Sequence, residues 1–164
     1  MTSTATTRVL FVCLGNICRS PTAHGVFESL VRERGLQGAI QIDSCGTGDW
    51  HIGHAPDQRA TAEAALRGYD LSDLRARQVQ VTDFVDFDYI LAMDKKNLSD
   101  LKAMSPPDFS GHLGLFLPFD PAAKLEEVPD PYYGGDEGFA QVLDMVETAS
   151  EGLLQEICGA NTPH

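Results

Sequence analysis

RVLFVCLGNICRSPTA, residues 8–23, is the stretch of sequence that decides the fold. Residues 8–13 form a mostly apolar run, which is typical of a buried strand. A short loop containing Gly and Asn follows. Ser20 and Pro21 then combine a good helix N-cap with a good first helical residue. We therefore predict a strand, a short loop and a helix, in that order.

Apolar runs of strand length alternate with helical patterns along the rest of the chain. The strand patterns lie at residues 39–44, 89–93 and 113–117. The helical patterns lie at 56–67, at 95–103 with Asp94 as the predicted N-cap, and at 136–158. Such alternation indicates βαβ units and a parallel sheet. We expect one three-layer α/β domain over residues 8–158, with a four-stranded parallel sheet flanked by helices. Residues 1–7 would form a flexible N-terminus and residues 159–164 a C-terminal tail.

Composition excludes several classes of function. The 164 residues carry a net charge of -12, which argues against a nucleic-acid partner because phosphate backbones are bound by an excess of Lys and Arg. No apolar run approaches the ~20 residues that span a bilayer, and no signal peptide precedes the first strand. We expect a cytoplasmic protein without membrane insertion. The four Cys and five His show no zinc-ligand spacing, so we predict no metal and no cofactor.

The loop after the first strand has the composition of an anion-binding site. It runs from Cys13 to Ser20, and a helix begins at its end. Gly and Asn tolerate unusual backbone angles, which lets successive N–H groups point at one anion. The helix N-terminus adds further N–H groups, and Arg19 can grip two phosphate oxygens. We predict a phosphate-binding loop made of Leu14, Gly15, Asn16, Ile17, Cys18 and Ser20.

The same surroundings would activate Cys13 as a nucleophile. A helix N-terminus and a neighbouring Arg stabilise the thiolate, which is the reactive form of cysteine. A covalent reaction with a phosphate ester also needs a proton donor for the leaving group. Asp130 is the candidate, because it lies in a long loop at residues 119–135 that has little periodicity and is broken by Pro121, Pro129, Pro131 and Gly134. Alone, Asp130 would be read as the start of an Asp-Pro turn. Together with the Cys13 loop, it is predicted to be catalytic.

These motifs resemble the low-molecular-weight protein tyrosine phosphatase family. The resemblance is carried by VCLGNICRSPTA at residues 12–23 and by DPYYG at residues 130–134. Shorter matches follow in the same order, over about residues 8–158: Asp43-Ser44, Asp57 with Arg59, Ala76-Arg77-Gln78, residues 87–91 and Met93-Asp94. The resemblance implies a metal-independent hydrolase that acts on phosphotyrosine proteins through a phosphocysteine intermediate. Cys13 would be the nucleophile, Arg19 would bind the phosphoryl oxygens, and Asp130 would be the general acid and base.

The resemblance also implies supporting roles around the loop. Ser20 would hydrogen-bond the Cys13 thiolate, and Asn16 would hold the strained loop backbone with help from Ser44. Many relatives have a His shortly before Ala-Arg-Gln, but this chain has none there, which leaves open how Asn16 is braced. Cys18 would form a reversible disulfide with Cys13 that protects it from irreversible oxidation. A small buried packing residue is the alternative reading of Cys18.

Aromatic residues are expected to line the substrate pocket. Trp50, Tyr132 and Tyr133 are the candidates, because a phosphotyrosine ring needs apolar or aromatic faces beside it. A partly buried anchor is the alternative reading of Trp50. In some relatives the tyrosines of the DPYY segment are phosphorylated. A tyrosine kinase acting on Tyr132 or Tyr133 is therefore a hypothesis for a partner.

Four other functions compete with this interpretation. An arsenate reductase of the same fold would need two more relay cysteines, which could only be Cys45 and Cys158, and it would have no use for Asp130. A protein-arginine phosphatase carries Thr where this chain has Ile17. A phosphate-reading module without activity would typically lack Cys13 or Asp130. A structural α/β domain would make both motifs coincidences.

Overall fold

The computed structural model describes residues 6–131 and 136–161, and it contains the expected four-stranded parallel sheet. The strands lie in the order β2-β1-β3-β4, so the first strand is central. This order places the loop after β1 between the loops that follow β2 and β3, which is where open parallel sheets bind ligands. The strand bounds are β1 (Thr7–Cys13), β2 (Ile40–Gly46), β3 (Tyr89–Ala92) and β4 (His112–Leu115).

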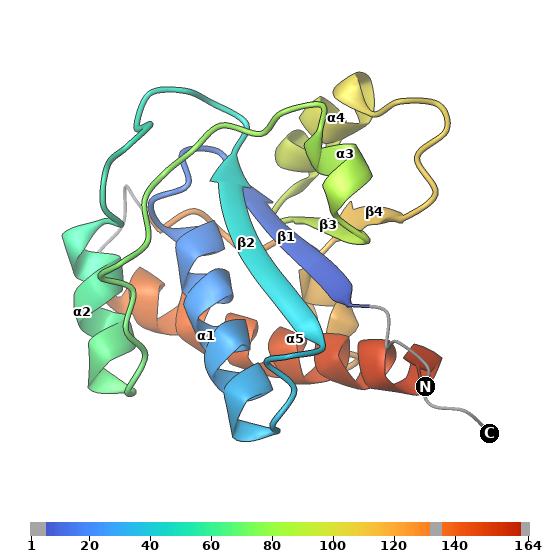
Figure 1. Cartoon of the computed structure of the whole chain (residues 1–164). Coiled ribbons are helices and arrows are strands. Elements are labelled where there is room, and N and C mark those ends of the chain that lie inside the picture. Colours follow the sequence, from blue (N-terminus) through green and yellow to red (C-terminus); the bar gives the residue numbers. More distant parts are fainter. Residues whose placement is uncertain (1–5, 132–135, 162–164) are drawn as a thin grey trace.

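Helices cover both faces of the sheet, which gives the three layers (Figure 1). One face carries α1 (Arg19–Glu33), α2 (Gln58–Leu66) and α5 (Asp136–Asn161). The other carries α3 (Asp83–Asp86) and α4 (Lys95–Met104). A short 3-10 helix, η1 (Leu117–Phe119), follows β4 and packs on α5.

The pleat of β1 divides its side chains between two hydrophobic cores. Val9 and Phe11 belong to the core under α1 and α5, whereas Leu10 and Val12 belong to the core under α3 and α4. All four side chains are fully buried. A strand buried on both faces reads as a continuous apolar run rather than an alternation, which is the pattern that this sequence shows.

The start of α1 differs from the sequence prediction. The helix begins at Arg19, and its N-cap is Cys18, which makes no capping bond with its side chain. The prediction of Ser20 as N-cap is therefore wrong. The Ser20 hydroxyl is engaged elsewhere, because it lies 3.0 Å from the Cys13 sulfur and 3.3 Å from the Cys45 carbonyl oxygen.

Other element bounds agree with the prediction to within a few residues. Asp94 caps α4 as expected, accepting a hydrogen bond from the Asn97 N–H at 2.8 Å. The short helices α3 and η1 were not predicted, and α5 extends three residues beyond the expected end at 158. Within the described residues, no helix is both long enough and apolar enough to cross a membrane.

Gly152 allows the closest approach between α5 and η1. A β-carbon at this position would lie 1.8 Å from the Phe119 carbonyl oxygen, and a backbone atom cannot move aside as the end of a side chain can. Gly159 lies further along α5, and a β-carbon there would meet nothing within 4 Å. Substitution of Gly159 is therefore a control for substitution of Gly152 in the same helix.

We predict that Gly152→Ala lowers the free energy of unfolding by about 1–3 kcal/mol through overpacking. Gly159→Ala should leave it unchanged or raise it by up to about 1 kcal/mol, because Ala is the better helix former. Urea denaturation of both variants measures the difference. Equal effects of the two substitutions would contradict the packing of α5 on η1.

Candidate active site

The loop between β1 and α1 turns through a left-handed residue, Asn16, whose φ is 57°. Asn tolerates this region better than most residues, but the conformation still has to be held. The Arg77 backbone N–H donates to Asn16 Oδ1 at 3.0 Å, and Asn16 Nδ2 donates to Ser20 Oγ at 2.8 Å. These two bonds brace Asn16 where the His of many relatives is missing.

Arg77 is itself fixed by a buried acid. Its guanidinium donates to both carboxylate oxygens of Asp83, at 3.0 and 3.1 Å, and forms an ion pair with Asp43 at 3.0 Å. Its backbone carbonyl accepts from the Gly46 N–H at 2.8 Å. The segment that braces the loop is thus anchored to β2 and α3.

The Cys13 sulfur lies at the end of β1 and faces two hydrogen-bonding groups. The Asn16 backbone N–H donates to it at 3.3 Å, and the Ser20 hydroxyl lies 3.0 Å away. Ser20 has a single hydroxyl proton, which can go either to the sulfur or to the Cys45 carbonyl. A Cys13 thiolate would therefore draw the Ser20 proton to itself and gain two donors.

Arg19 provides a buried positive charge beside this sulfur. Its Nη1 donates to Asp94 Oδ2 at 2.8 Å and to the Val128 carbonyl at 3.0 Å. Burial of Arg19 lowers its pKa, but the negative charges of Cys13, Asp94 and Asp130 outweigh burial and raise the pKa above its usual value. The guanidinium therefore stays charged. With Nη1 occupied by these two acceptors, an anion in the pocket would be bound through Nε and Nη2, on the side of the guanidinium that faces Asp130.

Sequence reasoning identified Asp94 as a helix cap but missed its second role. Asp94 Oδ1 caps α4, while Oδ2 holds Arg19 from the neighbouring strand loop. The available signal was its position directly after β3, because loops after adjacent parallel strands meet at one edge of the sheet.

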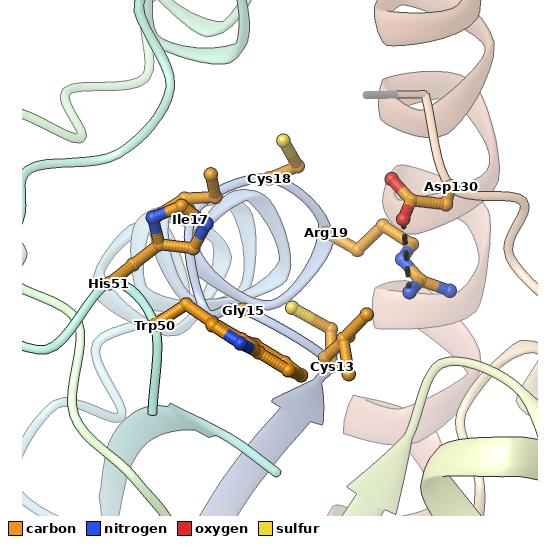
Figure 2. Close-up of a pocket in the computed structure, with 9 residues that line it drawn as sticks. Cys13, Gly15, Ile17, Cys18, Arg19, Trp50, His51 and Asp130 are labelled. Atoms are coloured by element: carbon orange, nitrogen blue, oxygen red, sulfur yellow. Dashed lines mark ion pairs between the residues drawn. The ribbon is translucent and has the colours of Figure 1, made fainter. Parts of the chain in front are cut away.

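These residues line a cavity of about 430 Å³ above the end of β1 (Figure 2). The loop from β1 to α1 forms its floor, and Arg19 forms an ion pair across it with Asp130, with Nη2 3.8 Å from Oδ2. The lining consists of Cys13, Leu14, Gly15, Ile17, Cys18, Arg19, Trp50, His51 and Asp130. The structure thus brings together the three residues predicted to be catalytic.

Trp50 and His51 reach this pocket from the loop after β2. The Trp50 side chain is 66% exposed, which does not favour the alternative reading of Trp50 as a partly buried anchor. His51 was not predicted, although it directly follows Trp50. A β-carbon on Gly15 would lie 2.9 Å from His51 Cδ2, so the glycine permits this close contact. The pocket therefore has a polar floor and a partly aromatic mouth.

The remaining predicted residues lie in different surroundings. Ser44 is buried near the end of β2, where its hydroxyl contacts His24 Nδ1 at 3.0 Å. Cys18 lines the pocket but is buried, and in Figure 2 its side chain points away from Cys13. Burial, followed by the nearby Asp57 and Cys13, raises the pKa of the Cys18 thiol. Tyr132 and Tyr133 lie outside the described residues.

Comparison with known proteins agrees with this geometry. Residues 8–161 match the family model described as low molecular weight phosphotyrosine protein phosphatase. YfkJ of Bacillus subtilis, named a low molecular weight protein-tyrosine-phosphatase, is 42% identical over 149 residues, which are 91% of this chain and 94% of YfkJ.

Solved structures share the whole fold. The crystal structure of a protein tyrosine phosphatase from Entamoeba histolytica, with Hepes in its active site, has a TM-score of 0.91 and 38% identity, covering 96% of this chain and all of that one. A Drosophila arginine phosphatase has a TM-score of 0.86 and 33% identity, with 91% and 96% of the two chains covered. This chain belongs to the low molecular weight phosphotyrosine protein phosphatase family.

Proposed function

We propose that this protein hydrolyses phosphotyrosine in proteins through a phosphocysteine intermediate. The observation that carries the proposal is the arrangement of Cys13, Arg19 and Asp130 around one pocket, with two hydrogen-bonding groups already at the Cys13 sulfur. The names of the relatives support the same substrate.

In the first step the Cys13 thiolate attacks phosphorus, in line with the phenolic oxygen. Arg19 and the loop N–H groups bind the three non-bridging oxygens, so that charge is stabilised without a metal. As the phosphorus–oxygen bond breaks, its electron pair moves to the phenolic oxygen, and Asp130 supplies the proton. The products are tyrosine and a phosphocysteine.

In the second step water replaces the sulfur. The Asp130 carboxylate takes a proton from the attacking water, a new phosphorus–oxygen bond forms, and the sulfur–phosphorus bond breaks. The electron pair returns to Cys13 as a thiolate. The Ser20 hydroxyl, 3.0 Å from this sulfur, can stabilise the departing thiolate by giving it the proton otherwise shared with Cys45. Inorganic phosphate then leaves.

The pocket walls favour an aryl phosphate over a phosphoguanidinium. Ile17 and Trp50 offer apolar and aromatic surface to the pocket, which suits a flat ring with no charge. Phosphoarginine would bring a polar guanidinium group against Ile17, where a buried donor would lack a partner. Arginine phosphatase activity is therefore the weaker candidate, even though one structural relative is named for it.

Arsenate reduction is also disfavoured by the placement of the cysteines. Cys45 is fully buried in the core between β2 and α3, and burial raises the pKa of its thiol. Cys158 lies on α5, and neither residue is among those that line the pocket. Cys13 and Cys45 belong to cores on opposite faces of the sheet, which does not favour a relay of thiols between them.

We also propose a cytoplasmic location and a regulatory partner. Cys13 and Cys18 in the pocket are free thiols, and the mechanism requires a reduced Cys13, which a reducing compartment maintains. A tyrosine kinase acting on Tyr132 or Tyr133 is proposed from the family resemblance alone, because both residues lie outside the described part of the chain.

We predict that the protein hydrolyses a phosphotyrosine peptide in the presence of a chelator and that Cys13→Ser abolishes turnover. Serine would be a far weaker nucleophile in the same place. Phosphate release in the steady state measures this, and phosphoarginine serves as the comparison substrate. Activity retained by Cys13→Ser would refute the covalent mechanism. Equal turnover of the two substrates would refute the specificity assigned to Ile17 and Trp50.

We predict that Asp130→Asn lowers kcat on a phosphotyrosine peptide by about 10²–10³, in the range expected for general acid–base catalysis. The loss should be smaller on 4-nitrophenyl phosphate, because nitrophenolate leaves without needing a proton. Asp120→Asn is the matched control, since the Asp120 carboxylate accepts a local bond from the Ala122 N–H in the same segment and, among the residues that the structure describes, does not line the pocket. Equal losses on both substrates would argue against a proton donor.

We predict that Cys18 rescues oxidised Cys13 increasingly well as pH rises. Peroxide converts Cys13 to a sulfenic acid, and the Cys18 thiolate then attacks its sulfur, forming a disulfide and expelling hydroxide. Because the pKa of Cys18 is raised, its thiolate fraction should grow about tenfold per pH unit from pH 7 to 8.

Mass spectrometry after a peroxide pulse measures the disulfide, and activity after dithiothreitol measures the recovery. Cys18→Ala should lose activity irreversibly, whereas Cys158→Ala, which lies outside the pocket, should recover like the intact protein. A disulfide rate that does not change with pH, or full recovery of Cys18→Ala, would contradict this protective role.

A further inference from the structure

One buried titratable side chain has no part in the proposed mechanism. His24 lies on α1 and is only 7% exposed, with its Nδ1 atom 3.0 Å from the hydroxyl oxygen of Ser44. A buried imidazole is costly unless its polar atoms have partners. An apolar side chain would fill this part of the core at a lower cost, so the contact between His24 and Ser44 indicates a role beyond packing.

His24 lies one helical turn after Ser20, on the same face of α1. Ser20 bonds to the carbonyl of Cys45, and His24 contacts the hydroxyl of the preceding residue, Ser44. Two consecutive residues at the end of β2 thus hold two consecutive turns of α1. Figure 1 shows α1 lying along β2, with the start of the helix near the end of the strand.

This two-point attachment restricts rotation of α1 about its axis. Hydrophobic packing alone is non-directional, whereas hydrogen bonds impose an angle and a distance. A small rotation of α1 would move Ser20 away from the Cys13 sulfur, because Cys13 belongs to β1 and not to the helix. It would also move Arg19, the first residue of α1.

We propose that His24 is a positioning residue for the phosphate-binding loop, acting through Ser44 on the orientation of Ser20 and Arg19. The expected effect on kcat rests on the proposed function. The positioning of Ser20 and Arg19 should affect the binding of any oxyanion in the loop, whatever the substrate is. His24 does not line the pocket and touches no reacting atom.

The second ring nitrogen indicates how the contact is made. His24 Nε2 lies 3.8 Å from the Glu28 carboxylate, and Arg32 lies 3.6 Å from the same carboxylate. Interaction with His24 lowers the pKa of Glu28, which keeps that side chain negative at neutral pH. A carboxylate beside Nε2 favours the proton there, so Nδ1 accepts from the Ser44 hydroxyl.

Two amide substitutions separate positioning from simple stability. His24→Asn places a polar atom two bonds from Cβ, where Nδ1 lies, and can still bond Ser44. His24→Gln places its polar atoms one bond further, toward Glu28. Gln is the better helix former, so a purely structural role would favour the Gln variant, and a positioning role would favour the Asn variant.

We expect kcat on the phosphotyrosine peptide to fall about fivefold in His24→Gln and His24→Leu, the effect of about one hydrogen bond, and by less than about twofold in His24→Asn. The double variant with Ser44→Ala should be no slower than Ser44→Ala alone, because His24 acts through Ser44. Val31→Ala, buried on α1 beyond His24, is the control that lowers stability without lowering kcat.

Binding of inorganic phosphate, measured by calorimetry, should follow the same order of variants and needs no turnover. It therefore tests the positioning role even if phosphotyrosine proves not to be the substrate. Equal phosphate affinity in His24→Asn, His24→Gln and His24→Leu would overturn the proposal. So would additive effects of His24→Leu and Ser44→Ala, or a loss of kcat in Val31→Ala as large as that in His24→Leu.

Discussion

Arg19 carries a full positive charge at a position that is 3% exposed, and the arrangement of the site follows from how that charge is held. An unpaired buried guanidinium would be strongly destabilising, so Asp94 and the Val128 carbonyl bind its Nη1 group. These partners come from the loops after β3 and before Asp130. One buried cation thus ties two segments distant in sequence to the end of β1, and a phosphate would complete its coordination.

The loop around Cys13 is subject to a different constraint: the single hydroxyl proton of Ser20 can form only one of two possible hydrogen bonds. Ser20 has one hydroxyl proton and two acceptors within reach, the Cys13 sulfur and the Cys45 carbonyl. Asn16 Nδ2 donates to the Ser20 oxygen, which leaves the Ser20 proton to be directed at the sulfur or at the carbonyl. The ionisation of Cys13 and the direction of this hydroxyl are therefore coupled, which suits a sulfur that must act first as nucleophile and later as leaving group.

The central strand, the loop and the roles of Cys13 and Arg19 could be predicted because they are local in sequence. A buried apolar strand, tolerant loop residues and a helix start lie within residues 8–23. The partners of Arg19 and Asn16 could not be predicted this way, because Asp94 and Arg77 are brought near only by the order of the strands. The prediction of Ser20 as N-cap was wrong for a related reason. A serine hydroxyl can cap a helix or donate to a thiolate, and only tertiary contacts decide which of the two it does.

The net charge of the protein bears on how it binds a phosphate group, because the donors of Arg19 and of the phosphate-binding loop lie inside an acidic protein. A net charge of -12 opposes the approach of a phosphate dianion, but exposed charges more than about 10 Å apart are largely screened at ordinary ionic strength. Attraction at the bottom of the pocket acts over a few ångströms, beside buried groups such as Arg19, where a lower dielectric makes each donor count for more. Affinity must therefore come from Arg19 and the loop rather than from long-range steering. A partly aromatic mouth around Trp50 then adds apolar contact that screening does not weaken.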